Sequence, residues 1–344
     1  PRAMSPSTRA SAETTTTNAT HASSAPELTF TAIAKSLLAG GVAGGVSRTA
    51  VAPLERLKIL QQVAGKDGGA YRGVVSGLSY MWRTEGMKGF FKGNGANCVR
   101  IVPNSAVKFL CYDHMSHAIL RARQTVDETA EMDVLTRLAG GAGAGIIAMS
   151  ATYPLDMVRG RLTVQKAAAD GSMNGQYRGI AHAFSVILQK EGMGAFYKGW
   201  TPSVIGVIPY VGLNFAIYET LKDVATTMQG LNSPKDLDVA SGLACGGVAG
   251  AVGQTVAYPF DVCRRRLQVS GWVQAGATSG PVYTGMMDCF RQTVRNEGFG
   301  ALFHGLSANY VKIMPSIAIA FVVYDKAKLA LFSEGEAYAK ISSS

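Results

Sequence analysis

The chain has 344 residues, of which 47% are hydrophobic and only 16% are charged, against an ordinary charged share of about 25%. Its formal net charge of +10 is typical of a protein that binds nucleic acid, anionic lipid or an anionic small substrate. The basic residues are spread among apolar segments without a nucleic-acid-binding motif, so we expect no nucleic-acid partner. The five cysteines are never spaced as CxxC, and the sequence therefore predicts neither a disulfide framework nor a metal or cofactor site.

The first part of the chain, residues 1–30, is rich in Ser, Thr and Ala and has almost no large apolar residues. Such a composition buries too little surface to fold, so we expect a disordered N-terminal tail. A second, short tail is expected over residues 333–344.

From Thr31 onward the sequence repeats itself at intervals of about 100 residues. The repeated marks are Tyr71-Arg-Gly73, Tyr177-Arg-Gly179 and Tyr283-Thr-Gly285, followed by Glu85-Gly86, Glu191-Gly192 and Glu297-Gly298. Periodicity of this kind indicates repeated structural units. We expect three of them, over residues 31–125, 132–228 and 236–332.

Each unit shows the same order of segments. An apolar, Gly-rich helix is expected over 31–62, 133–164 and 237–268, a short amphipathic helix over 74–84, 180–190 and 286–296, and a second apolar helix over 94–120, 200–224 and 306–332. The apolar segments are long enough to cross a bilayer, which takes about 20 residues. The predicted fold is an all-α membrane protein with six transmembrane helices in three repeats around a pseudo-threefold axis, plus three short helices.

Three copies of the pattern Pro-x-acid-x-x-base lie in the first long helix of each unit. The charged residues, called here the Pro-motif ring, are Glu55, Lys58, Asp156, Arg159, Asp261 and Arg264. An acid and a base three residues apart share one face of a helix and form an intrahelical surface pair in the plainer interpretation. Because buried charges are costly unless paired, we favour pairing between helices: Glu55 with Arg159, Asp156 with Arg264, and Asp261 with Lys58. Such a ring is a gate that must break to open.

A second set of charges lies near the far end of the other long helices. This outer set comprises Tyr112, Asp113, Tyr218, Glu219, Lys222, Tyr324, Asp325 and Lys328. Its first copy has Ser116 where the others have a base, so we expect a weaker second gate. The alternative is that these are charges at helix ends that reach out to the membrane surface.

Between the two sets lie polar and basic residues that neither set explains. The candidates for substrate contact are Arg48, Arg100, Asn104, Lys108, Gly206, Val207, Tyr210, Asn214 and Lys312. Intramembrane bases without matching acids favour an anionic partner, and Arg binds phosphate bidentately. Gly206-Val207 with Tyr210 offers a flat apolar slot for a ring. Each residue alone could be structural, and no catalytic grouping recurs, so we do not expect an enzyme.

The three Pro-x-acid-x-x-base motifs and the Tyr-acid-x-x-base endings of the outer set, together with the Glu-Gly-x5-[Lys/Arg]-Gly stretches, resemble the mitochondrial carrier family. The resemblance covers residues 31 to about 330. The resemblance implies a multi-pass antiporter of the inner membrane that works by alternating access between two gates, with the short helices on the matrix side. It also implies Gln62 and Gln268 as braces of the Pro-motif ring, with Thr163 in the middle repeat where a third would stand. Cardiolipin at the short helices and a monomeric state are further implications.

Within that family, Arg100, Gly206-Val207 and Lys312 match the contact pattern of adenine-nucleotide carriers. The resemblance is strongest to the plant-type branch, which exchanges AMP or ADP with ATP. A coenzyme A carrier or an ATP-Mg/phosphate carrier is the alternative within the family. A membrane scaffold without transport is the alternative from another class.

Overall fold

The computed structural model describes residues 30–65, 68–71, 73–126, 131–165, 177–230, 237–272 and 281–331. Within these ranges all regular structure is helical and there is no strand. The predicted tails fall outside them, except for Phe30, which begins the first helix.

Each repeat contributes long helices separated by a short one, in the predicted order. Repeat 1 contains α1 (Phe30–Ala50), α2 (Ala52–Val63), α3 (Val74–Phe90) and α4 (Asn94–Gln124). Repeat 2 contains α5 (Val134–Val164), α6 (Ile180–Glu191) and α7 (Trp200–Met228). Repeat 3 contains α8 (Val239–Val269), α9 (Met286–Glu297) and α10 (Leu306–Leu331). Three short 3-10 turns are η1 (Gly68–Tyr71), η2 (Met193–Tyr197) and η4 (Phe299–Phe303).

The first long helix of repeat 1 differs from the prediction, because it breaks at Val51 into α1 and α2. Pro53 follows two residues later, and proline removes a backbone donor and crowds the preceding turn. Its counterparts Pro154 and Pro259 lie inside continuous helices, α5 and α8. The same motif therefore interrupts the helix in repeat 1, whereas the helices of repeats 2 and 3 continue through it.

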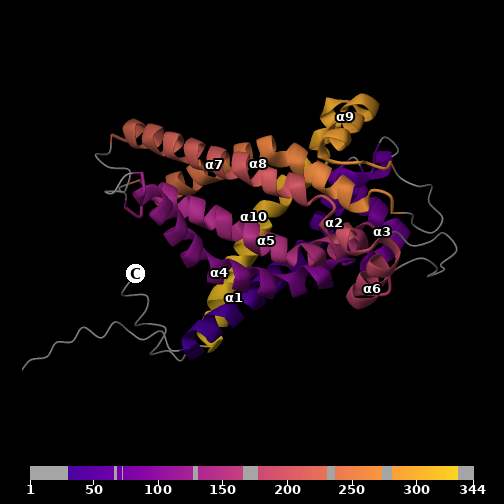
Figure 1. Ribbon diagram of the computed structural model, residues 1–344, viewed down its shortest axis with the longest axis horizontal. Coiled ribbons are helices and arrows are strands. Elements are labelled where there is room, and N and C mark those ends of the chain that lie inside the picture. The colour runs from indigo at the N-terminus through magenta and orange to yellow at the C-terminus, as the bar shows by residue number, and fades with distance from the viewer. Residues whose placement is uncertain are drawn as a thin grey trace, which may run out of the picture.

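The long helices pack most extensively between repeats rather than within them: α4 lies on α5, α7 on α8, and α10 on α1 (Figure 1). The segments that carry the Pro motifs, α2, α5 and α8, contact one another pairwise. The short helices α3, α6 and α9 lie toward this same end of the molecule (Figure 1). All three repeats thus share one orientation, and we call this end the Pro-motif end.

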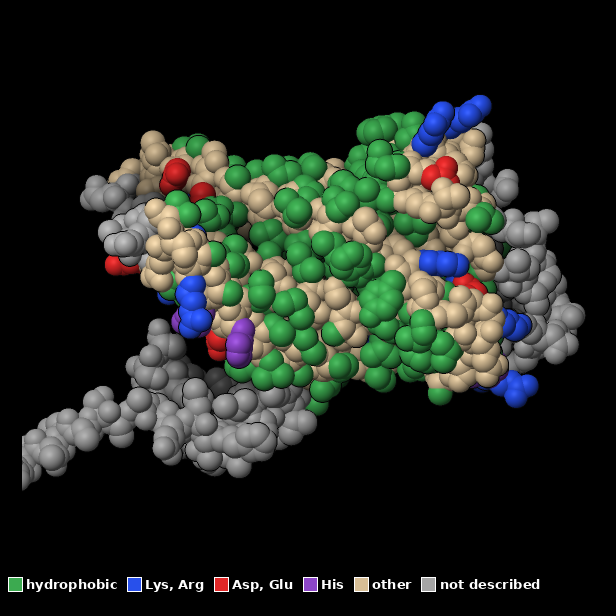
Figure 2. Space-filling model, viewed as in Figure 1, with side chains coloured by type: hydrophobic (Ala, Val, Ile, Leu, Met, Phe, Trp, Pro, Cys, Tyr) green, Lys and Arg blue, Asp and Glu red, His purple; other side chains and the backbone are tan. Residues whose placement is uncertain are grey.

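The surface has the polarity of a membrane protein. Figure 2 shows hydrophobic side chains along the middle of the long helices, with the charged side chains gathered toward the two ends. Among the residues that the structure describes, three segments are long and apolar enough to cross a membrane: Val134–Val164, Met193–Met228 and Phe299–Ala327.

Gly140 lies at a close approach of α4 and α5. A Cβ atom on Gly140 would lie 2.9 Å from the Cα of Ser116 and 3.0 Å from its Cβ. Ser116 is buried in this contact. The residue at the missing base position of the outer set is therefore part of the seam between two repeats.

This seam predicts opposite effects for two similar substitutions. Gly140→Ala should lower the thermal unfolding midpoint, because overpacking costs roughly 1–3 kcal/mol and outweighs the gain of about 1 kcal/mol in helix propensity. Gly145→Ala is the matched control, since its added methyl would meet nothing within 4 Å, and it should be neutral or stabilising. Thermal unfolding of purified protein in detergent measures both; equal midpoints would contradict the proposed close contact.

Candidate binding cavity and charge ring

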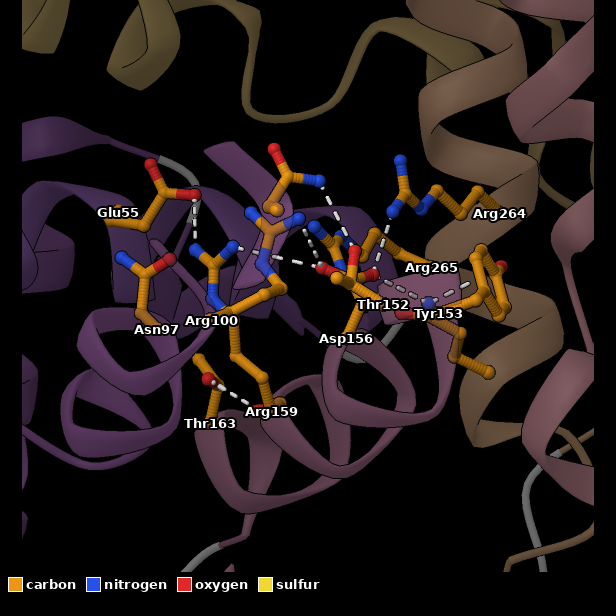
Figure 3. Close-up of polar contacts among 12 residues, drawn as sticks. Glu55, Asn97, Arg100, Thr152, Tyr153, Asp156, Arg159, Thr163, Arg264 and Arg265 are labelled. Atoms are coloured by element: carbon orange, nitrogen blue, oxygen red, sulfur yellow. Dashed lines mark hydrogen bonds and ion pairs between the residues drawn. The ribbon is translucent and has the colours of Figure 1, made fainter. Parts of the chain in front are cut away.

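All three interhelical pairs of the Pro-motif ring are present, and Figure 3 shows the residues of two of them, Arg159 with Glu55 and Arg264 with Asp156. The nitrogen–oxygen distance is 2.7 Å in each of the pairs Arg159–Glu55, Arg264–Asp156 and Lys58–Asp261. The intrahelical alternative is weaker, because Arg159 lies 3.8 Å from Asp156 on its own helix. Each pair joins two repeats, so the ring links all three at the Pro-motif end.

Two of the three pairs carry a glutamine, as the resemblance implies. Gln268 Nε2 donates to Asp156 at 2.9 Å, and Gln62 Nε2 donates to Asp261 at 3.2 Å. The hydroxyl of Thr163 instead donates to the carbonyl of Arg159 on its own helix. Among the hydrogen bonds of the described residues, none joins Thr163 to Glu55.

The same two pairs are also covered by an aromatic ring, which the sequence reasoning missed. The guanidinium of Arg264 lies 5.4 Å from the ring centre of Tyr153, and the ammonium of Lys58 lies 5.4 Å from that of Tyr258. Cations at this distance are attracted by the ring face. Each tyrosine directly precedes a motif proline, whereas Ala52 holds that position in repeat 1. The Tyr-Pro pairs in the sequence were a signal from which these contacts between a tyrosine ring and a base of the Pro-motif ring could have been predicted.

Beneath the ring lies a second layer of charges that sequence reasoning also missed. Three buried arginines pair with the repeated glutamates: Arg56 with Glu85, Arg161 with Glu191, and Arg266 with Glu297. The Nε atoms of these arginines donate to the carbonyls of Thr163, Gln268 and Gln62 in turn, each in another repeat. The acids of the Glu-Gly marks therefore have a structural role, which is to hold arginines that fasten the repeats together.

Glu85 and Glu191, in the short helices, ionise more readily than ordinary glutamates. Burial alone would raise the pKa of Glu85, but the hydrogen bonds and positive charges of Arg56 and Lys92 lower it. The pKa of Glu191 is lowered against burial in the same way, by Arg161 and Lys198. Both carboxylates are therefore charged, paired parts of the fold.

A cavity of about 300 Å³ lies beside the ring and is lined mainly by polar and charged residues. Its lining consists of Arg48, Val51, Glu55, Asn97, Arg100, Arg159, Lys312 and Ser316. The predicted phosphate contacts Arg48, Arg100 and Lys312 are thus brought together. Asn97, which sequence reasoning missed, accepts a hydrogen bond of 2.9 Å from Arg48.

These cations are not free of acids, and here the expectation of unpaired bases is wrong. The ammonium of Lys312 pairs with Glu55, and Arg100 lies 3.8 Å from Asp156. The substrate-site bases are therefore partly held by the carboxylates of the ring. Arg100 Nε is nevertheless buried without a hydrogen-bond partner among the described residues, and such a donor is rarely left unused.

The predicted apolar slot forms a second cavity, of about 160 Å³. Gly206, Val207 and Tyr210 line it from α7, with Ala257 and Phe260 facing them from α8. A Cβ on Gly206 would lie 3.0 Å from the Cβ of Phe260, so this glycine keeps the slot open.

Three other candidate residues lie elsewhere. Asn104 donates to Thr152 at 3.1 Å across the α4–α5 contact. Asn214 lies against Gly250 and Gly253 of α8, and Lys108 is exposed. They border the cavities less directly than the sequence indicated.

The described charges of the outer set are not paired in this state. Among its described side chains, Asp113, Glu219, Lys222 and Asp325 form no ion pair, and Lys222 lies 5.8 Å from the ring centre of Tyr218 on its own helix. Tyr112 faces Gly141 of the neighbouring helix, and Tyr218 faces Gly246 in the same way. Tyr324 is half-buried, and the side chain of Lys328 lies outside the described part of the chain.

Comparison with known proteins matches the mitochondrial carrier protein family three times, over residues 31–123, 130–229 and 235–335. The chain belongs to the mitochondrial carrier family. It is a multi-pass protein of the mitochondrial inner membrane, built on the carrier fold.

The relatives of this carrier differ in length. It is 58% identical over 316 residues to the mitochondrial adenine nucleotide transporter ADNT1 of Arabidopsis thaliana, covering 88% of this chain and 89% of that protein. It is 39% identical to the calcium-binding mitochondrial carrier protein SCaMC-2-B of Danio rerio and 38% identical to the mitochondrial adenyl nucleotide antiporter SLC25A25 of Mus musculus. Those two alignments cover 86% of this carrier but only 59% of each relative.

The layer of arginines predicts a large difference between two ion pairs. Glu85→Gln should destabilise the carrier by roughly 3–5 kcal/mol, because it leaves Arg56 buried without its charge partner. The control is Asp133→Asn, which weakens the pair Arg123–Asp133 at side-chain exposures of 39% and 47% and should lower the melting midpoint far less, because exposed pairs contribute little to stability. Thermal unfolding of both variants decides, and similar losses would contradict this role of Glu85.

The lowered pKa of Glu85 also sets the direction of a pH effect. A carboxylate with a lowered folded-state pKa contributes stability above its unfolded value, near 4.5, and loses it as pH falls through the folded value. The melting midpoint of the wild-type protein should therefore fall below pH 4.5 more steeply than that of Glu85→Gln. Parallel curves for the two proteins would show that Glu85 is not the titrating group.

Proposed function

We propose that this carrier is an antiporter that exchanges adenine nucleotides, AMP or ADP for ATP, across the mitochondrial inner membrane by alternating access. The observation that carries the proposal is the excess of cations around two cavities, one polar and one apolar, that are joined by a chain of charges. The names of its relatives from Arabidopsis thaliana and Mus musculus support the same substrate class.

The charges around the cavities favour a polyanion. Among the described residues, the cations here are Arg48, Lys58, Arg100, Arg159, Arg264, Arg265 and Lys312, whereas the carboxylates are only Glu55, Asp156 and Asp261. Bringing phosphate groups into the cavity would neutralise this excess and supply acceptors for Arg100 Nε. Arginine also binds phosphate bidentately, which fixes its orientation.

The apolar slot suits the flat ring of adenine. Gly206 and Val207 present little side-chain bulk, while Tyr210 and Phe260 offer aromatic surface. The two cavities are linked by a chain of charges, because Arg100 lies 3.8 Å from Asp156 and Asp156 pairs with Arg264 of the slot. A nucleotide with phosphates in the first cavity and its base in the second spans this chain.

In this proposal the Pro-motif ring is the matrix gate and the outer set is the cytoplasmic gate. The observed state, with the ring paired and the described outer charges unpaired, corresponds to a cavity that opens toward the cytoplasm. Bound nucleotide supplies the differential interaction energy that opens one gate as the other closes.

We further propose that the carrier works as a monomer and binds cardiolipin at its short helices. A pocket of about 260 Å³ at the Pro-motif end supports the lipid site. It is lined by Lys198 and Gly199 at the start of α7 and by Tyr283, Thr284 and Gly285 before α9. A cation beside backbone amide groups suits a lipid phosphate.

The test is counter-exchange in proteoliposomes loaded with ATP and offered labelled AMP, ADP, phosphate or coenzyme A. We expect uptake of AMP and ADP that depends on internal nucleotide. Uptake of coenzyme A without AMP would replace the substrate assignment, and phosphate uptake against ATP-Mg would favour the phosphate-exchanging alternative. No exchange, with no ligand-dependent shift in thermal stability, would favour a scaffold.

Two substitutions test the phosphate contacts. Arg100→Ala and Lys312→Ala should each reduce exchange at least tenfold while the protein stays folded, because each removes a charge-assisted bond worth roughly 1.5–3 kcal/mol. Arg137→Ala, at an exposed position near the start of α5, is the control and should exchange like the wild-type protein. Unchanged exchange in the first two variants would refute their role.

A further inference from the structure

The matrix gate can be divided into three sectors, each formed by one ion pair between two repeats. Sector 1–2 is the pair Glu55–Arg159, sector 2–3 is Asp156–Arg264, and sector 3–1 is Asp261–Lys58. The pairs are equal in length, so their surroundings decide how firmly each sector is held.

Sectors 2–3 and 3–1 are reinforced by a glutamine and a tyrosine. Gln268 donates to Asp156, while the hydroxyl of Tyr153 donates to the carbonyl of Lys198 at 3.2 Å. In sector 3–1, Gln62 donates to Asp261, and the hydroxyl of Tyr258 donates to the carbonyl of His304 at 3.1 Å. Each tyrosine therefore also ties a gate helix to the backbone before the next long helix.

Sector 1–2 has neither support. Thr163 stands in the glutamine position and Ala52 in the tyrosine position. A small polar cavity of about 10 Å³ occupies the space, lined in part by Ala52, Glu55, Arg159 and Thr163. This volume is close to that of one water molecule, so the least braced pair of the gate also has room for a water molecule beside it.

The bases of the substrate site meet the gate acids in a matching threefold pattern. Arg100, Gly206 and Lys312 are spaced 106 residues apart, and each is aligned with the gate acid of the following repeat. Lys312 binds the second carboxylate oxygen of Glu55, while Arg100 lies 3.8 Å from Asp156. Gly206 has no side chain to offer Asp261.

A bound phosphate would therefore act on the three acids unequally. Asp156 keeps Arg264, Arg265 and Gln268 when Arg100 turns to a phosphate. Asp261 keeps Lys58 and Gln62, because no substrate-site base holds it. Glu55 loses Lys312 and keeps Arg159 as its remaining ion pair within the described part of the chain.

We infer that Lys312 couples the substrate to the gate, and that the ring opens first in sector 1–2. This inference rests on the proposed exchange of phosphate-bearing substrates. Without substrate, Lys312 is a counter-ion of Glu55; with substrate, the phosphate takes Lys312 and only the unbraced pair Glu55–Arg159 weakens. The other two sectors break later, after their glutamines are drawn apart.

The first experiment adds the missing brace. Thr163→Gln places an amide beside Glu55, and Thr163→Met is the control of the same shape without an amide. If sector 1–2 breaks in the rate-limiting opening step, the added bond slows ADP–ATP exchange about tenfold at saturating ADP in Thr163→Gln relative to Thr163→Met. Equal rates in the two variants would overturn the inference.

The reciprocal experiment removes the existing braces. Gln268→Met and Gln62→Met should each lower the melting midpoint without nucleotide, and each should change the exchange rate less than Thr163→Gln does relative to Thr163→Met, because those sectors remain intact when the first one opens. Faster exchange in either variant, matching the slowing by Thr163→Gln, would show that the ring opens as one unit and overturn the inference. If Thr163→Gln does not melt cooperatively and so is not folded, Gln268→Met and Gln62→Met alone test the order in which the sectors open.

The role of Lys312 has a test that needs no transport. Lys312→Gln and Glu55→Gln, alone and combined, should show coupling in their melting midpoints without nucleotide, and additive effects would overturn the pairing. Wild-type protein that exchanges no nucleotide would refute the proposed function itself. Active wild-type protein with equal Thr163→Gln and Thr163→Met rates would refute only the order of opening.

Discussion

A carboxylate buried among helices is stable only while a base neutralises it, and three such carboxylates meet at one end of this carrier. Glu55, Asp156 and Asp261 each take their nearest ring base from a neighbouring repeat, so the closest pairs at this end all join two repeats. The requirement fixes the closed arrangement of α2, α5 and α8 and makes it reversible. Replacing a pair by apolar side chains could hold the helices together, but it would remove the charges that a polyanion can compete for.

The two charged layers have different roles, because the buried arginine–glutamate pairs stabilise the fold and the Pro-motif ring breaks and re-forms. Arg56, Arg161 and Arg266 are buried and bind both a glutamate and a backbone carbonyl, so they have little freedom to exchange partners. The bases of the ring above them border the cavities, where a substrate offers an alternative anion. The deeper layer can therefore keep the short helices attached to the long ones while the upper layer breaks and re-forms.

Repetition made much of this architecture predictable. The spacing of the Pro motifs gave the partners of all six ring charges, because equal depth in three equivalent helices leaves few ways to pair them. It could not show that Lys312 binds Glu55, since that contact depends on how far two non-equivalent helices tilt together. Nor did the spacing assign arginine partners to Glu85, Glu191 and Glu297. Counted from the motif proline, Arg56 lies four positions earlier than Arg161 and Arg266. Only the folded backbone brings Arg56 to the equivalent place.

The residues that depart from threefold symmetry determine how the three sectors of the ring differ in their response to substrate. A ring with three identical sectors would respond to substrate equally on all sides and would need all its pairs to weaken together. Thr163 and Ala52 remove that constraint in one sector, and Gly206 removes a base from another while opening a slot for a ring. A nucleotide is itself asymmetric, with charge at one end and an aromatic base at the other. The substitutions that make the repeats unequal therefore suit both the shape of the proposed substrate and a gate that yields at one point first.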